Sequence, residues 1–108
     1  MLNARYTKNN RVRFKSLKDR EEGVKIFNEF FQNLRNKEKG IEMKGHIVLE
    51  SLSDPKEAIV LTFWETRDVM DRFYSPENTI LSNLVERVKP LFEKMPERTD
   101  YRVTELSM

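Results

Sequence analysis

The stretch AIVLTFWETRDVMDRFY, residues 58–74, decides the fold. Its first half, Ala58–Trp64, is an almost unbroken run of apolar, β-branched and aromatic side chains, which is typical of a strand buried on both faces. After Glu65 and Thr66 the period changes, and helical spacing relates four further residues, Val69, Met70, Phe73 and Tyr74. Helices of the same chain can cover one face of such a strand. We expect a second subunit to cover the other face.

Length and composition indicate one domain that spans residues 1–108. Charged residues make up 35% of the chain, but the net charge is only +2, which is a weak argument for a polyanionic partner. The chain has no cysteine, so disulfides and thiolate metal sites are excluded. No apolar stretch approaches the roughly 20 residues of a membrane span, and the first residues lack the apolar core of a signal peptide. We therefore expect a cytoplasmic protein without a membrane partner.

Residues 2–14 alternate between apolar and polar side chains, which predicts a half-buried strand. One side of this strand carries the apolar residues Leu2, Ala4, Tyr6, Val12 and Phe14. Asn10 shares their parity and interrupts the pattern. Either a bulge lies at Asn9–Asn10, or Asn10 points inward, where an unpaired amide would cost about 1–3 kcal/mol.

The remaining pattern predicts three helical segments and three further strands. We expect a helix that begins after the cap residue Asp19 and ends at Lys37–Gly40. Gly23 lowers the helix propensity of this segment. Its apolar stripe is Val24, Phe27, Phe30, Phe31 and Leu34. Strands at 45–52 and 58–64 form a hairpin around the turn at 53–55, and Thr66 caps a short helix that ends near Tyr74. Ser75 caps the next helix, whose stripe continues through Leu91 to Met95 until Pro96 ends it, and Thr99–Leu106 is the last strand.

This order is βαββαβ, with the second helical segment split in two. It predicts an α+β, ferredoxin-like fold, in which a four-stranded antiparallel sheet carries its helices on one face. The surplus apolar residues of the third strand must lie on the helix-free face. Face-to-face packing of two such sheets in a homodimer is the simplest way to cover them.

Conventional catalytic motifs are nearly absent. His46 is the only histidine, so one chain cannot build a multi-histidine metal site, and no glycine-rich loop could hold a nucleotide. Most carboxylates alternate with Lys or Arg, as expected for a solvated surface. The best candidate site is a pocket between the sheet and the split helix, lined by Tyr6, Asn10, Phe27, Phe31, Trp64, Phe73, Tyr74, Asn83, Leu84 and Val88. The alternative is that Trp64 and Phe73 are ordinary core residues.

The βαββαβ order, the run Ile59–Trp64 followed by Glu-Thr, and the helix before Ser75-Pro76 resemble the antibiotic-biosynthesis-monooxygenase (ABM) family. The resemblance covers most of the chain and implies the dimeric α+β barrel of that family. It also implies oxidation of a hydrophobic, aromatic small molecule by O2 without a cofactor or metal. In that chemistry the protein supplies a dry pocket and a hydrogen-bond donor, a role that Asn10 and Tyr6 could fill.

The segment Asn10-Arg-Val-Arg-Phe14 is also similar to a segment of the small haem-degrading oxygenases, whose asparagine is catalytic. That resemblance implies Asn10 as the catalytic residue and haem as an alternative cofactor. The same family has a second tryptophan and an axial histidine at the positions of Phe73 and Asn83. The departures at both positions leave iron without its usual protein ligand.

Two further alternatives remain. The protein could be a non-catalytic dimeric barrel that binds a hydrophobic small molecule. The βαββαβ order is also that of RNA-recognition modules, which stack bases on exposed aromatic residues of their central strands. The segment Lys44-Gly45-His46-Ile47 matches the RNA-binding signature poorly, so a nucleic-acid partner is not the prediction that we favour.

Overall fold

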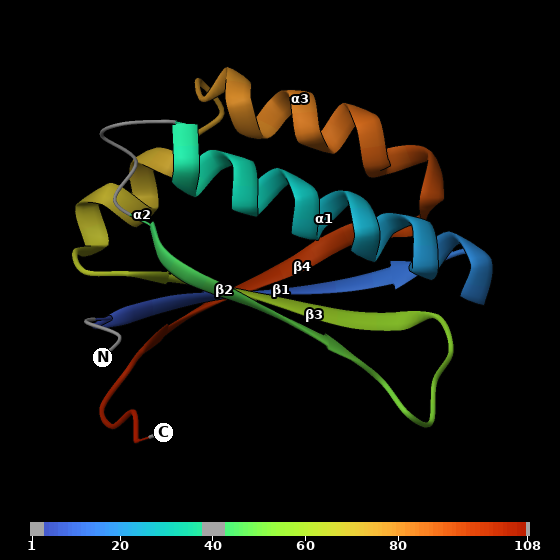
Figure 1. Cartoon of the computed structure of the whole chain (residues 1–108), viewed down its shortest axis with the longest axis horizontal. Helices are drawn as coiled ribbons and strands as arrows, with labels where there is room; N and C mark the ends of the chain where they lie inside the picture. The colour runs from blue at the N-terminus through green and yellow to red at the C-terminus, as the bar shows by residue number, and fades with distance from the viewer. Residues whose placement is uncertain (1–3, 38–42, 108) are drawn as a thin grey trace.

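The computed structural model describes residues 4–37 and 43–107 (Figure 1). In chain order the elements are β1 (Tyr6–Phe14), α1 (Leu17–Lys37), β2 (Met43–Glu50), β3 (Glu57–Trp64), α2 (Arg67–Phe73), α3 (Thr79–Val88), the 3-10 turn η1 (Lys89–Leu91) and β4 (Phe92–Arg102). The strands form one antiparallel sheet in the order β2-β3-β1-β4, and the helices cover one of its faces (Figure 1). The predicted ferredoxin-like fold is confirmed. None of the described helices is long and apolar enough to cross a membrane.

Strand β1 lies inside the sheet and pairs with both β3 and β4. Val12 and Phe14 are buried towards the helices, whereas Arg11 is exposed on the opposite face. The register with β3 runs without a shift through Asn9 and Asn10, so there is no bulge in β1 at this place. Asn10 faces the helices and keeps only 8% of its surface exposed. Leu2, which was expected in the same strand, lies outside the described residues.

The pairing of β1 with β4 is irregular instead, and β2 has a further register shift against β3 between Met43 and Gly45. Arg11 pairs with Glu97 and Arg13 pairs with Lys94, so Met95 and Pro96 together stand opposite the single residue Val12. This arrangement is a β-bulge, a position that tolerates proline because proline has no N–H to donate to the ladder. The bulge brings two consecutive residues to the helix-covered side of β4.

The predictions for the C-terminal third were therefore partly wrong. Pro90 lies in η1, and the helix ends there instead of continuing to Met95. The last strand begins at Phe92, earlier than the predicted Thr99, and ends at Arg102. Pairing with β1 along almost the whole of β4 outweighs the helical spacing of the apolar residues, because tertiary contacts override local propensity.

Two predicted helix starts were also wrong. The Oγ atom of Ser16 accepts a hydrogen bond from the N–H of Asp19 at 3.1 Å, so α1 begins before Asp19. Asn78, not Ser75, caps α3: its Oδ1 accepts from the N–H of Ile80 at 3.1 Å. Thr66 caps α2 as predicted. Gly40, the expected end of the first helix, lies outside the described residues.

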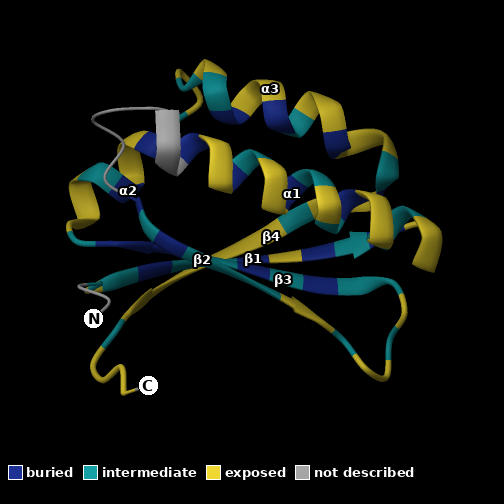
Figure 2. Cartoon of the chain, viewed as in Figure 1, coloured by how far each residue is buried: buried dark blue, intermediate teal, exposed yellow. Residues whose placement is uncertain are grey.

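The main core lies between the sheet and the helices (Figure 2). The face of β3 towards the helices is fully buried, and its residues are Ala58, Val60, Thr62 and Trp64. The helix-free face is more exposed: on its two outer strands, Leu49 of β2 and Tyr101 of β4 keep 48% and 52% of their surface accessible. Ile59 and Leu61 are half-buried on that same face. The sequence-based expectation of a surplus apolar surface there is met.

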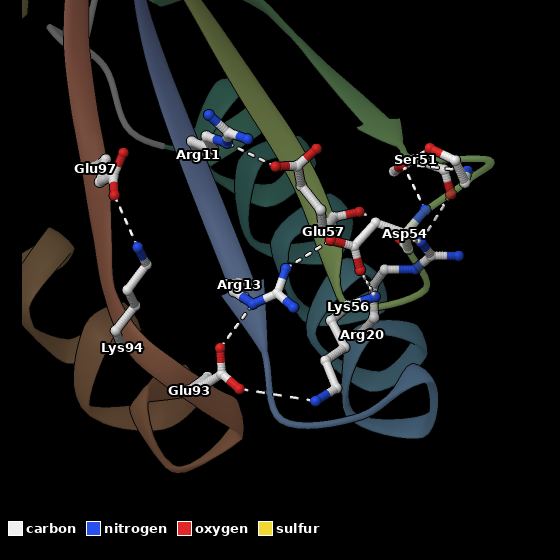
Figure 3. Close-up of polar contacts among 11 residues, drawn as sticks. Arg11, Arg13, Arg20, Ser51, Asp54, Lys56, Glu57, Glu93, Lys94 and Glu97 are labelled. Atoms are coloured by element: carbon white, nitrogen blue, oxygen red, sulfur yellow. Dashed lines mark hydrogen bonds and ion pairs between the residues drawn. The ribbon is translucent and has the colours of Figure 1, made fainter.

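Ion pairs surround one end of the helix-free face (Figure 3). The Nε atom of Arg11 lies 2.6 Å from Glu57 Oε1, and Arg13 binds Asp54 at 2.6 Å and Glu93 at 2.7 Å. The hydrogen bond from Arg13 lowers the pKa of the Asp54 carboxyl. These carboxylates are paired with arginines, so they form a structural network and are poor candidates for acid–base chemistry.

Gly23 is required by packing, although glycine is a weak helix former. A Cβ atom at this position would lie 2.3 Å from Phe14 Cε1 and 2.7 Å from Phe14 Cζ. Phe14 is itself held in an edge contact with Phe92 and has no exposed surface, so it has little freedom to move.

We expect Gly23→Ala to destabilise the protein by about 1–2 kcal/mol, because overpacking outweighs the gain of about 1 kcal/mol in helix propensity. Urea unfolding measures the change. Glu22→Ala, at the adjacent exposed position, is the control and should change stability by less than about 0.5 kcal/mol. A stability of Gly23→Ala equal to or above that of the wild type would contradict the packing argument.

Candidate functional site

The amide of Asn10 has a defined orientation in the helix-covered face of the sheet. Its Nδ2 atom lies 3.0 Å from the carbonyl oxygen of Val60 and 3.4 Å from that of Lys8. Carbonyl oxygens only accept hydrogen bonds, so the nitrogen must be the atom that faces them. The Nδ2 atom also donates to Tyr74 Oη at 3.2 Å. The inward position that was one of two sequence-based alternatives is therefore the observed one, and the buried amide has partners.

Tyr74 links this amide to β3. Its hydroxyl oxygen lies 2.8 Å from Thr62 Oγ1, and Trp64 Nε1 donates to the same Thr62 oxygen at 3.0 Å. Thr62 and Trp64 have no exposed surface. The result is a chain of hydrogen bonds from Trp64 through Thr62 and Tyr74 to Asn10, inside an otherwise apolar core. We name these four residues the polar cluster.

The hydrogen positions in the polar cluster follow from satisfaction of the buried groups. Thr62 Oγ1 accepts from Trp64, and its own hydrogen has no acceptor other than Tyr74 Oη within the described part of the chain. A hydroxyl hydrogen left unpaired at this fully buried position would cost about 1–3 kcal/mol. Thr62 therefore donates to Tyr74, as Asn10 does. The phenolic hydrogen of Tyr74 then remains available to a group outside the cluster.

Burial raises the pKa of the Tyr74 phenol above its ordinary value of 10.0. The hydrogen bonds from Thr62 and Asn10 and the nearby charge of Arg98 act in the opposite direction but do not cancel the effect of burial. Two cations flank the ring: Lys8 Nζ lies 4.5 Å and Arg98 Cζ lies 5.0 Å from its centroid. At neutral pH Tyr74 is thus a phenol that donates a hydrogen bond, and it is not a base.

Two hollows meet at Tyr74. The inner cavity, about 30 Å³, lies between the sheet, α1 and α3, and its lining is Asn10, Val12, Phe27, Phe31, Val60, Tyr74, Leu81, Leu84, Val85, Val88, Phe92, Pro96 and Arg98. The outer vestibule, about 290 Å³, opens beside α3 and β4 and is lined by Tyr74, Ser75, Pro76, Asn78, Leu81, Ser82, Val85, Glu86, Met95 and Arg98. The two hollows share four lining residues, among them Tyr74 and Arg98. The inner cavity has only about the volume of two water molecules and a mainly apolar lining, whereas the vestibule has room for a small aromatic molecule.

The structure brings some of the sequence-predicted pocket residues together and separates others. Asn10, Phe27, Phe31 and Leu84 line the inner cavity, with Tyr74 and Val88. Trp64 and Phe73 pack on each other with ring centroids 5.1 Å apart and line neither hollow, as in the core alternative. Tyr6 also lies outside both linings, at the Trp64 end of β1. Asn83 is exposed on α3, so its predicted place in the pocket is not the observed one.

Thr62 and Arg98 are site residues that sequence reasoning missed. Thr62 alternates with Val60 and Trp64 on a strand that was expected to be apolar on both sides, and this lone hydroxyl was a usable signal. Arg98 gave no signal, because it follows Pro96 in a segment that was predicted to lie between a helix and a strand. Its position became apparent only from the register, which pairs Arg98 with Asn10.

The residues present do not fit haem. Asn83, at the position of the axial histidine in the haem-degrading pattern, is exposed on the outer side of α3. His46 lies on β2, where its Nε2 atom is 3.2 Å from Asn28 Oδ1, and it lines neither hollow. Within residues 4–37 and 43–107, no group of three or more His, Asp or Glu side chains could hold a metal ion.

The helix-free face offers no platform for stacked RNA bases. On the two central strands, β1 and β3, its only aromatic residue is Phe63, which keeps 6% of its surface exposed. Arg11 and Arg13 of the same face are paired with carboxylates. The described central strands therefore lack, on this face, the exposed aromatic residues on which RNA-recognition modules depend.

The raised pKa of Tyr74 predicts a pH dependence of stability. The unfolded chain loses the phenolic proton near pH 10.0, whereas the folded protein retains it to higher pH. Above this pH the unfolded state binds fewer protons than the native state, so the free energy of unfolding falls as the pH rises. We expect a steeper fall in the wild type than in Tyr74→Phe, measured by urea unfolding in a series of alkaline buffers. Tyr101→Phe, which removes an exposed phenol, is the matched control, and equal slopes in wild type and Tyr74→Phe would contradict the assignment.

Comparison with known proteins identifies the fold. No protein-family model matches the sequence, and no curated protein matches it significantly. A monooxygenase of Streptomyces coelicolor in complex with the ligand nanaomycin D superposes with a TM-score of 0.79 at 9% identity, covering 98% of this chain and 93% of that chain. A cofactor-independent oxygenase of Streptomyces nogalater gives a TM-score of 0.69 at 12% identity, with 95% and 96% covered.

A dimeric ferredoxin-like protein from an uncultured marine organism gives a TM-score of 0.74 at 12% identity, with 97% of this chain and 92% of that chain covered. Candidate antibiotic biosynthesis monooxygenases of Chloroflexus aurantiacus and Caulobacter crescentus are similar as well. At identities this low, the likeness establishes the fold alone. The chain has the ferredoxin-like fold that solved structures of ABM proteins have, in agreement with the resemblance seen in the sequence.

Proposed function

We propose that this protein is an ABM-like monooxygenase that oxidises an electron-rich aromatic small molecule with O2 and needs no cofactor. The observation that carries this proposal is the polar cluster, which presents one phenolic donor to an apolar cavity that continues into an open vestibule. The likeness to a cofactor-independent oxygenase and to a monooxygenase with a bound ligand supports it at the level of the fold.

The chemistry requires little from the protein. A substrate with an acidic C–H beside an enol or phenol loses this proton to solvent, the resulting carbanion transfers its electron pair to O2, and the peroxide anion takes a proton back from solvent. A C–O bond forms as a hydroperoxide, which loses water to leave a carbonyl. In the overall reaction, one CH2 group and one O2 molecule give one C=O group and one water molecule, and no external reductant is needed.

The chain supplies a water-poor cavity and a hydrogen-bond donor. Apolar side chains of α1, α3 and β3 exclude water from the inner cavity, which strengthens any hydrogen bond made there. The Tyr74 hydroxyl donates to the oxygen on which negative charge develops, while Thr62 and Asn10 hold the phenol in place. Because the Nδ2 atom of Asn10 is already bound to Val60, we assign Asn10 the role of positioning Tyr74.

Oxygen uptake tests this function. With anthrone as substrate, we expect Tyr74→Phe to lower kcat by about 10²–10³, the usual loss for one oxyanion donor. Tyr101→Phe should keep the wild-type rate, because Tyr101 is exposed and lies outside both hollows. Asn10→Ala should lower kcat in the same direction.

The outcomes of this assay distinguish the alternatives. Wild-type turnover in Tyr74→Phe would exclude the donor role. Saturable binding of anthrone without oxygen uptake would identify a non-catalytic binding protein. A Soret shift on addition of stoichiometric haemin, with uptake that depends on haemin, would instead favour the haem alternative.

We also propose that the protein works as a homodimer joined through the helix-free face of the sheet. The half-buried apolar residues Ile59 and Leu61 lie on a central strand of this face, and the exposed Leu49 lies beside them on β2; such a patch marks an interaction surface. The dimeric state of one structure of the same fold supports this assembly.

Sedimentation equilibrium tests the assembly. We expect Leu61→Lys to shift the protein towards the monomer, because a lysine at the centre of the interface would bury an unpaired charge. Leu52→Lys is the matched control, since Leu52 is fully exposed at the tip of the β2–β3 hairpin and should leave the dimer intact. A wild-type protein that stays monomeric at micromolar concentration would exclude the dimer.

A further inference from the structure

Arg98 is the charged residue that both hollows share. It lies on β4 opposite Asn10, so its side chain belongs to the helix-covered face of the sheet. It lines the inner cavity and the vestibule, and no other charged residue lines the inner cavity as described. The vestibule contains one further charged residue, Glu86 of α3, which makes no ion pair with Arg98 in the described part of the chain.

The acids nearest to Arg98 along β4 are already paired with lysines. Asp100 Oδ1 lies 3.0 Å from Lys8 Nζ, and Glu97 Oε1 lies 2.9 Å from Lys94 Nζ. Within the described residues, the guanidinium of Arg98 has the ring of Tyr74 as its interaction partner, at 5.0 Å from the ring centroid. Among residues 4–37 and 43–107, its five N–H donors therefore have no carboxylate partner, and the side chain lies where the inner cavity and the open vestibule share their lining.

A ligand that enters the vestibule removes water from this guanidinium. Desolvation of a cation is unfavourable unless an anionic group replaces the lost water. A carboxylate or an ionised enol matches the planar fork of arginine and forms short, charge-assisted hydrogen bonds with it. The aromatic part of the same ligand would lie against Tyr74, Leu81 and Val85, which both hollows share.

We propose that the molecule bound at this site carries an anionic oxygen on an aromatic ring, as a carboxylate or an ionised enol, and that Arg98 binds it. This inference rests on the proposed function only in placing the ligand in the vestibule. It names the substrate class, and it assigns Arg98 a role in substrate selection. The ring centroid of Tyr74 lies 5.0 Å from Arg98 Cζ, so an oxygen bound by Arg98 would lie close to Tyr74.

Calorimetric titration with matched pairs of probes tests the inference. The first pair is naphthoate and its methyl ester, and the second is lawsone, whose enol is ionised at neutral pH, and its methyl ether. We expect the wild type to bind at least one anion about tenfold or more tightly than its neutral partner, as charge-assisted hydrogen bonds predict. The pair that shows the preference distinguishes a carboxylate from an enolate ligand.

Variants at Arg98 identify the source of the preference. In Arg98→Gln the anion and its neutral partner should bind equally, whereas Arg98→Lys should keep part of the difference, because it retains the charge and loses the fork. Arg102→Gln is the control: it removes an exposed arginine of the same strand and face that lines neither hollow, and it should leave the preference unchanged. Added salt should weaken binding of the anion and spare the neutral partner.

Equal binding of both members of each pair to the wild type would overturn the inference, and so would no detectable binding of either anion. A preference that survives in Arg98→Gln would overturn it too. Oxygen uptake plays no part in these titrations. An Arg98-dependent preference without any turnover would thus exclude the proposed oxygenase and support the anion site. Turnover of neutral substrates alone would support the oxygenase and exclude the anion site.

Discussion

The pairing of β1 with β3 on one side and with β4 on the other is the constraint on which the site depends. This register sets Asn10 opposite Val60 and Arg98, so the amide, the carbonyl that it binds and the guanidinium come from three adjacent strands. Because side chains alternate along a strand, a slip of one residue in either ladder would turn its partner to the other face of the sheet. The apolar neighbours Val12 and Phe14 hold the register, since the same slip would expose them.

The polar cluster joins the strands to the start of the helical cover. Tyr74 follows directly after α2, and the side chain of Asn78 donates to the carbonyl of Phe73 at 2.7 Å while it caps α3. The phenol is thereby fixed from two directions, by the backbone turn behind it and by hydrogen bonds from the sheet in front. A donor that is held in this way needs little reorganisation when charge appears beside it, which is the physical content of preorganisation.

The sequence predicted those parts of the molecule in which apolar residues recur at the regular spacing of a strand or a helix. The alternation in β1 predicted the inward face but left an inward Asn10 as one of two alternatives, and the change of period after Trp64 predicted the step from β3 to α2. Strand β4 was missed because Leu91 and Met95 continue a helical spacing, and only pairing with a distant strand makes that segment extended. The prediction that Asn83 lines the pocket was wrong. Leu81, Leu84 and Val88 define the inner side of α3, and Asn83, next to Leu84, lies about 100° away from it around the helix axis. Arg98 depends on the register alone.

The bulge at Met95–Pro96 has a consequence for how copies of the molecule can meet. Strand β4 is an outer strand of the sheet, exposed along almost its whole length (Figure 2). A regular outer strand would offer a row of free N–H and C=O groups to any extended chain nearby. Here a proline lacks the donor, the extra residue breaks the spacing, and charged side chains such as Glu93 and Lys94 flank the gap. These features disfavour growth of the sheet by strand addition at this border, and with it open-ended fibrous assembly.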